Sequence, residues 1–210
     1  LSGGVFNSGN PFDFTFANLM SYMESHDEER LAYELHHYGR DFIQAEINES
    51  GRDFENHSED FTGDMTTFIQ RLKLPAAINL LLPGPRMVWQ FGELGYDYSI
   101  DFNGRTGNKP VRWDYYDDPK RRELHDFYAK LLNMKQKHDV FNNLAAYDLG
   151  DGSWIKWLRF EYNGTKVVVM TNFQAWKAGD AQNGVQSEFI DVGLSGIFNS
   201  TCSDEWYNVL

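Results

Sequence analysis

The sequence contains a single cysteine, Cys202, so no disulfide can form within the chain, and cysteine usage neither requires nor excludes an oxidising compartment. No apolar run reaches the roughly 18 residues that a membrane-spanning helix requires. Basic residues are scarce, with 19 Lys and Arg against 31 Asp and Glu, for a net charge of −12. Because clustered basic side chains bind phosphate backbones, this composition argues against nucleic acid as a partner.

Apolar and aromatic side chains are plentiful. They make up 41% and 16% of the 210 residues, which is enough for a packed core in one large or two small domains. Aromatic faces also stack on sugar rings, so a neutral ligand suits this negatively charged chain. The sequence opens at Leu1 without an initiator methionine, and we expect a processed protein or a fragment of a longer one.

Two short apolar runs, residues 19–23 and 87–91, are predicted to be strands. Between them, apolar residues recur at helical spacing from Asp64, which suits an N-cap, to the stop signal at residues 83–84. Pro75 is expected to kink or divide this helix. A strand, a helix and a strand in this order form a βαβ unit, which implies parallel pairing.

A second helix is predicted to begin at Asp118-Pro119, and the chain from Asn142 onward has an all-β pattern. The helix has an apolar face and a basic last turn, formed by Leu124, Phe127, Leu131, Leu132 and Met134 and by Lys135, Lys137 and His138. Predicted strands at 153–162, 166–172 and 187–192, with a hairpin turn at Tyr162-Asn-Gly-Thr, indicate a small antiparallel sandwich.

Three histidines lie in or near the polar stretch between the two predicted strands. Residues 30–38 predict a helical turn, and residues 48–64 have no sustained periodicity, which predicts a long exposed loop. A metal site would need ligands at ordered spacing, so we interpret His36, His37 and His57 as solvated loop residues.

The residues that point to chemistry gather in Ser21–Glu29, where a strand-like run ends in His26 and Asp27. A His-Asp pair alone is common on solvated loops, but a second stretch, Leu82–Gly95, follows in order. Together they resemble the α-amylase family of glycosidases, glycoside hydrolase family 13. Its barrels carry an Asn-His-Asp-like motif after the seventh strand, and a Leu-Pro-Gly segment leads the eighth strand into a Gly-Glu loop. Ser25 stands here where Asn is common.

The resemblance implies an α/β fold followed by an all-β part. Residues 1–140 would be the last strands and helices of a (β/α)8 catalytic barrel, and residues 141–210 an antiparallel β-sandwich domain. The carboxyl ends of parallel strands line the active site of such a barrel. The His26-Asp27 pair is therefore expected at the catalytic face.

The resemblance also implies roles for single residues. Asp27 would be the carboxylate that stabilises the transition state, while His26, Trp89, Glu93 and Arg105 would bind substrate. In this family the nucleophile and the acid/base come from the fourth and fifth strands, which precede both motifs. We therefore expect part of a retaining hydrolase of α-glucosidic bonds in starch-type glucans, inactive as this chain alone.

Further expectations concern cofactors, location and assembly. The resemblance implies no cofactor or metal in this chain and allows calcium in a full-length parent. It suggests a secreted, periplasmic or cell-surface protein whose partner is an α-glucan oligosaccharide or polysaccharide. Part of a barrel leaves unpaired strand edges, so we also expect self-association.

Two other functions fit the residues less closely. The aromatic content and negative charge suit a non-catalytic carbohydrate-binding module, in which Trp154, Trp157 or Trp176 of the sandwich would bind the sugar. A His-Asp pair also occurs in metal-dependent phosphohydrolases, although the strand-like setting of His26-Asp27 argues against that class.

Overall fold

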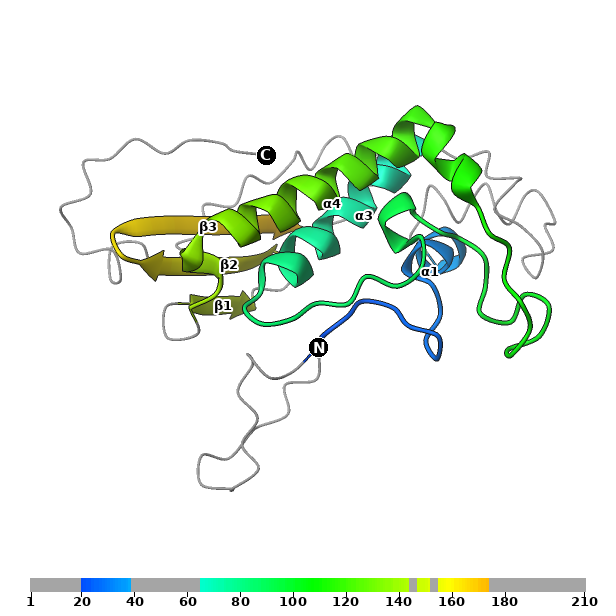
Figure 1. Ribbon diagram of the computed structural model, residues 1–210, viewed down its shortest axis with the longest axis horizontal. Coiled ribbons are helices and arrows are strands. Elements are labelled where there is room, and N and C mark those ends of the chain that lie inside the picture. Colours follow the sequence, from blue (N-terminus) through cyan, green and yellow to red (C-terminus); the bar gives the residue numbers. More distant parts are fainter. Residues whose placement is uncertain (1–19, 39–64, 144–146, 152–154, 174–210) are drawn as a thin grey trace, which may run out of the picture.

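The structure, a computed structural model, describes residues 20–38, 65–143, 147–151 and 155–173. Its elements are α1 (Leu31–Tyr38), α3 (Met65–Leu81), α4 (Pro119–Lys137), β1 (Tyr147–Asp151), β2 (Ile155–Tyr162) and β3 (Thr165–Asn172), with short 3₁₀ helices at Gly92–Leu94, Trp113–Asp117 and Asp139–Phe141. The predicted loop at 48–64, the strand at 187–192, His57, Trp154 and Trp176 lie outside these residues. Helices α3 and α4 lie side by side, with the sheet at one end and α1 toward the other (Figure 1).

Helix α3 confirms the prediction from apolar spacing and ends just before the stop signal at residues 83–84. Pro75 lies inside it, so of the two expected effects, a kink or a division, the division does not occur. The missing proline N–H removes one helical hydrogen bond, but Leu72 and Ala76, on either side of Pro75 in sequence, are buried in the core and hold this part of the helix in place. At the C-terminus, the Arg86 side chain donates to the Asn79 carbonyl at 2.8 Å, which satisfies an acceptor that the helix leaves open.

Helix α4 begins as predicted at the Asp118-Pro119 pair. The Asp118 carboxylate accepts from the Lys120 amide at 2.7 Å and the Arg121 amide at 3.2 Å, and proline occupies the first helical position. Its buried stripe includes Leu124, Tyr128 and Leu131, and Phe127 and Met134 pack at its edge. The prediction for Leu132 is wrong, because this side chain is 42% exposed.

The sheet is an antiparallel meander in the order β1-β2-β3. The predicted hairpin between β2 and β3 is confirmed, with φ of 48° at Asn163 and 78° at Gly164. Positive φ at both central residues is the geometry of a type I′ turn, whose twist matches that of paired strands. Asn followed by Gly therefore fixes the register of β2 on β3.

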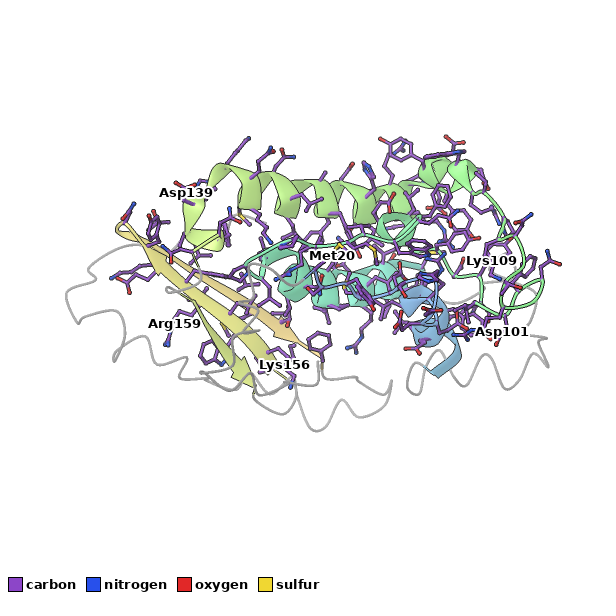
Figure 2. The ribbon with its side chains drawn as sticks, turned by 60° about the horizontal axis from the view of Figure 1, so that its bottom comes forward. Met20, Asp101, Lys109, Asp139, Lys156 and Arg159 are labelled. Atoms are coloured by element: carbon purple, nitrogen blue, oxygen red, sulfur yellow. The ribbon has the colours of Figure 1, made fainter. Side chains whose placement is uncertain are left out.

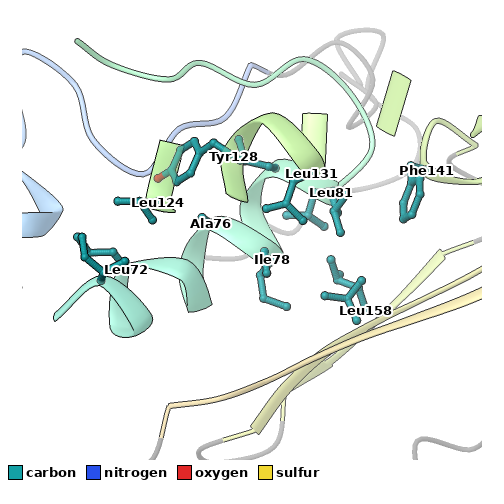
Figure 3. Packing of buried hydrophobic residues seen from close by; sticks show 14 of the residues in the cluster. Leu72, Ala76, Ile78, Leu81, Leu124, Tyr128, Leu131, Phe141 and Leu158 are labelled. Carbon is teal, nitrogen blue, oxygen red and sulfur yellow. The ribbon is translucent and has the colours of Figure 1, made fainter. Parts of the chain in front are cut away.

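One hydrophobic cluster joins the helices to the sheet. Leu124 and Leu131 of α4 lie over α3, while Ile78 of α3 is directed toward Leu158 of β2 (Figure 3). Phe160 of β2 belongs to the same cluster. Each fully buried side chain of this size stabilises the fold by about 1.5–3 kcal/mol. The predicted boundary after residue 140 thus falls within one continuous core.

The two predicted strands at 19–23 and 87–91 are largely wrong. The described residues contain one bridge instead, between Ser21 and Arg86, the residue just before the second run. Residues 87–89 are not paired as a strand, residues 90–91 form a turn before the 3₁₀ helix Gly92–Leu94, and Leu19 lies outside the described part. The direction of pairing is nevertheless parallel, as the βαβ reading requires. Across the described part of the chain, no helix combines the length and the apolar character needed to cross a bilayer.

Candidate functional site

The parallel bridge between Ser21 and Arg86 brings the two predicted motifs together. Backbone hydrogen bonds of 3.0 and 3.3 Å flank it. Because the paired segments run in the same direction, the residues that follow them emerge at the same end. His26 and Trp89 are consequently neighbours, with ring centroids 5.7 Å apart and planes inclined by 46°.

The side chains of the His26-Asp27 pair are exposed, while the neighbouring Ser25 side chain hydrogen-bonds to the backbone of Asp27. His26 Nε2 lies 3.2 Å from Asp27 Oδ2, and the two side chains are 71% and 67% exposed. Buried Ser25 accepts a hydrogen bond from the Asp27 amide at 3.0 Å, and its hydroxyl donates to Glu28. Ser25, which stands at the Asn position of the resembled motif, therefore fixes the backbone while the Asp27 carboxylate stays open to a ligand.

Arg105 reaches this pair from a distant loop. Its guanidinium donates to the Asp27 carbonyl at 2.5 Å across 78 residues of sequence. Together the segments enclose a cavity of about 660 Å³. Its walls include all but one of the predicted site residues: His26, Asp27, Trp89 and Arg105, with Ser25, Arg30, Gln90, Ile100, Thr106, Gly107, Asn108, Lys109 and Val111.

Glu93 is the predicted site residue that the structure places elsewhere. It lines a second cavity, of about 700 Å³, with Phe91, Trp113, Tyr128 and other residues of α4. The two cavities share Gln90 and Val111 as lining residues, so they adjoin. Glu93 therefore lies beside the His26-Asp27 cavity and not in its wall.

Glu24 is a buried acid that sequence reasoning missed. Only 6% of the residue is exposed, and its Oε2 accepts from the Leu31 amide at 2.9 Å, at the start of α1. A Cβ at Gly92 would lie 2.0 Å from Glu24 Oε1, so the glycine makes room for the carboxyl group. Burial raises the pKa of Glu24 to about 7, against the opposing effects of the Leu31 amide and the Arg30 charge.

Glu29 joins the His26-Asp27 segment to the distant loop. Its carboxylate accepts from the Ile100 amide and the Ser99 hydroxyl, both at 2.7 Å. The next residue, Arg30, is buried below Trp89 and Tyr96, with its guanidinium carbon 5.8 and 4.9 Å from the ring centroids. No sequence motif marks these residues, and the only local signal is a run of acids, Asp27-Glu28-Glu29, followed by Arg30.

The loop itself is anchored to α4 through a buried ion pair. Arg121 Nη2 lies 2.9 Å from Asp97 Oδ2, and the Tyr115 hydroxyl donates to the other oxygen of Asp97 at 2.7 Å. Arg121 also donates to the Gly95 carbonyl at 2.5 Å. A buried carboxylate needs such partners to offset its lost hydration. The cluster therefore fixes the start of the loop, at Asp97, against α4.

The histidine interpretation is partly wrong. His36 is buried in α1 and packs edge-on against Phe68, with centroids 6.4 Å apart. The side chain of His37 and all of His57 lie outside the described part. Within the residues that are described, no three His, Cys, Asp or Glu side chains are arranged to hold a metal ion.

Comparison with known proteins adds no name to this geometry. No protein-family model matches the chain, and no curated protein matches it. The α-amylase-like reading therefore depends on the two sequence motifs and on the cavity in which their residues meet.

Proposed function

We propose that the His26-Asp27 cavity binds a neutral α-glucan and that the chain is part of an α-amylase-like glycoside hydrolase. One observation carries the proposal. Residues named from two separate motifs and a distant loop line the same cavity, although nothing in their local sequence requires them to meet. A chance resemblance of short motifs would scatter such residues over the surface.

The polar groups of the cavity suit a ligand rich in hydroxyl groups. Arg105 donates to the Asp27 carbonyl, Arg30 to the Gln90 carbonyl at 3.4 Å, and Lys109 to three carbonyls of its own loop. These cations are thus engaged with the backbone within the protein. The exposed carboxylate of Asp27 can accept hydrogen bonds from sugar hydroxyl groups, and the Trp89 ring offers an apolar face.

The roles follow from the demands of glycoside hydrolysis. An oxocarbenium-like transition state distorts the sugar ring, and a carboxylate that accepts hydroxyl hydrogen bonds more strongly in that state lowers the barrier. We assign this role to Asp27 and binding of the same sugar to His26. The parallel bridge across α3 supports the proposal that residues 1–140 belong to the end of a (β/α)8 barrel. We expect binding without bond cleavage, because the nucleophile and acid/base of this family precede both motifs.

Calorimetric titration of the chain with maltoheptaose tests the proposal. Asp27→Asn should weaken binding at least about 10-fold, which corresponds to the roughly 1.4 kcal/mol lost with one charged hydrogen bond. Asp126→Asn is the matched control, because Asp126 is also exposed and lies 3.2 Å from an adjacent histidine, His125, outside this cavity. Equal binding by both variants, or none by the unchanged chain, contradicts the proposal.

A further inference from the structure

The loop that carries Arg105 closes around the ammonium group of Lys109. Lys109 Nζ donates to the carbonyls of Phe102 and Gly104, each at 2.8 Å, and of Gly107 at 3.1 Å. An ammonium has three donors, and all three are used within one short stretch of backbone. Figure 2 shows Lys109 beside the Asp101 end of the loop, far from the sheet residues Lys156 and Arg159.

The backbone is shaped to converge on this point. Asn103 and Gly104 have φ of 58° and 79°, which turns the chain back on itself. A Cβ at Gly107 would lie 1.8 Å from the Asn103 carbonyl oxygen, so only glycine fits where the loop closes. Carbonyl groups that point at one another repel unless a cation lies between them. The ammonium lies among these carbonyl groups and offsets their repulsion, in addition to the backbone hydrogen bonds within the turn.

The loop forms one wall of the His26-Asp27 cavity. Arg105, Thr106, Gly107 and Asn108 all line it, and Lys109 does so as well. One contact of this stretch crosses the cavity to the opposite wall, from Arg105 to the Asp27 carbonyl. Any change in the fold of residues 102–109 thus moves the polar groups that face a ligand beside Asp27.

We propose that Lys109 is a positioning residue, whose ammonium fixes residues 102–109 as a rigid wall of the cavity and so holds Arg105 on the Asp27 backbone. Its part in glucan binding rests on the proposed function, whereas its part in ordering the loop does not. The wall supplies the guanidinium, hydroxyl and amide groups of Arg105, Thr106 and Asn108. The Lys109 ammonium thereby sets which sugar hydroxyl groups the cavity can recognise.

Hydrogen exchange tests the ordering of the loop. In the native loop the Gly104 amide donates to Asp101 and the Gly107 amide to Gly104, each at 2.8 Å. Lys109→Met keeps the side-chain stem and removes the donors, so exchange at these amides should be faster by about 10-fold or more, as expected from losing charge-assisted hydrogen bonds. Lys130→Met, the same change at an exposed position of α4, should leave them unaltered. Unaltered exchange in Lys109→Met overturns the inference.

A rescue experiment separates the ammonium from general packing. In Lys109→Ala, n-propylammonium should restore slow exchange of the loop, whereas tetramethylammonium, which has no N–H donor, should not. Rescue by both salts or by neither overturns the inference.

Where the unchanged chain binds maltoheptaose, Lys109→Met should weaken that binding about 10-fold with no change in the overall melting temperature. If Lys109→Met loosens the loop but leaves the affinity unchanged, the positioning role is overturned. If the unchanged chain does not bind maltoheptaose at all, the proposed function is contradicted, and the exchange and rescue experiments alone decide the role of the ammonium.

Discussion

A carboxyl group at Glu24 lies inside the protein, between the start of α1 and the backbone of Gly92. It lies two residues before His26 in the same segment, so its protonation is linked to the stability of that segment. Glu93 and Glu29 lie near enough to raise its pKa further, and Arg30 acts in the opposite direction. Tyr128 of α4 is also within electrostatic reach, and its own pKa is raised by burial. The neighbourhood therefore favours the neutral acid.

Glu24→Gln should alter the pH dependence of folding. The carboxyl pKa is about 7 in the folded chain and has an ordinary value of 4.5, so between these values the folded state holds a proton that the unfolded state has lost. The stabilisation is present below pH 4.5 and is lost as pH rises through 7. It amounts to about 3 kcal/mol in the free energy of unfolding, at 1.36 kcal/mol per pKa unit.

Urea unfolding at pH 4.5 and pH 7 measures this difference. Glu24→Gln should lose less stability than the unchanged chain between the two pH values, because the amide does not titrate. Glu34→Gln removes an exposed acid of α1 and should retain the pH dependence of the unchanged chain. A Glu24→Gln variant with that same dependence would show that Glu24 is not a buried titrating acid.

At the residue scale, the sequence identifies the groups that touch the cavity better than those that support them. His26, Asp27 and Trp89 follow from the two motifs and Arg105 from the loop after the second, and the structure brings them to one cavity. In the sequence, Glu24 cannot be told apart from the exposed acids near it, because its burial depends on Gly92, which is distant in sequence. Contacts of that kind are decided by the fold and leave no local pattern.

At the scale of elements, local chemistry predicts helices and hairpins well. The Asp118-Pro119 start of α4 and the Asn163-Gly164 turn both act through neighbouring backbone groups, and both appear as predicted. The strand predictions at 19–23 and 87–91 fail for the opposite reason. A parallel strand is stabilised by partners elsewhere in the chain, so an apolar run alone does not determine how much of it pairs.

Asp118→Ala should destabilise the fold through α4. The change removes the acceptor for the Lys120 and Arg121 amides at the helix start, a loss that typically costs about 1 kcal/mol. Asp117→Ala removes an exposed acid one residue earlier, outside the cap, and should change the unfolding free energy by less than about 0.5 kcal/mol. Chemical unfolding of both variants decides this, and equal effects would show that the cap does not stabilise α4.

At the scale of the molecule, the second cavity is lined by several exposed apolar side chains. Val88, Val111, Trp113 and Leu132 are 36%, 62%, 73% and 42% exposed. Apolar groups gathered in this way favour association, because covering them removes apolar surface from water. Val88 follows the bridge residue Arg86, Val111 and Trp113 lie just before α4, and Leu132 lies on α4.

We therefore predict that the chain self-associates through this surface. Light scattering over a concentration series should show an average mass that rises above 24.4 kDa. Leu132→Lys should reduce the association, because it places a charge in the surface. Met170→Lys, at a 52% exposed position on β3, should not. A strictly monomeric chain at all concentrations would rule out this surface as an interface.

The central claim is that an α-glucan binds beside Asp27 and not on the sheet. Nuclear magnetic resonance with maltotetraose tests it most directly, because each tryptophan indole gives a separate signal. We predict that the Trp89 indole, the His26 imidazole and the backbone amides of residues 105–109 shift together, while the Trp157 indole on β2 does not. Shifts at Trp157 without shifts at Trp89 and His26 would contradict the account and favour a carbohydrate-binding module.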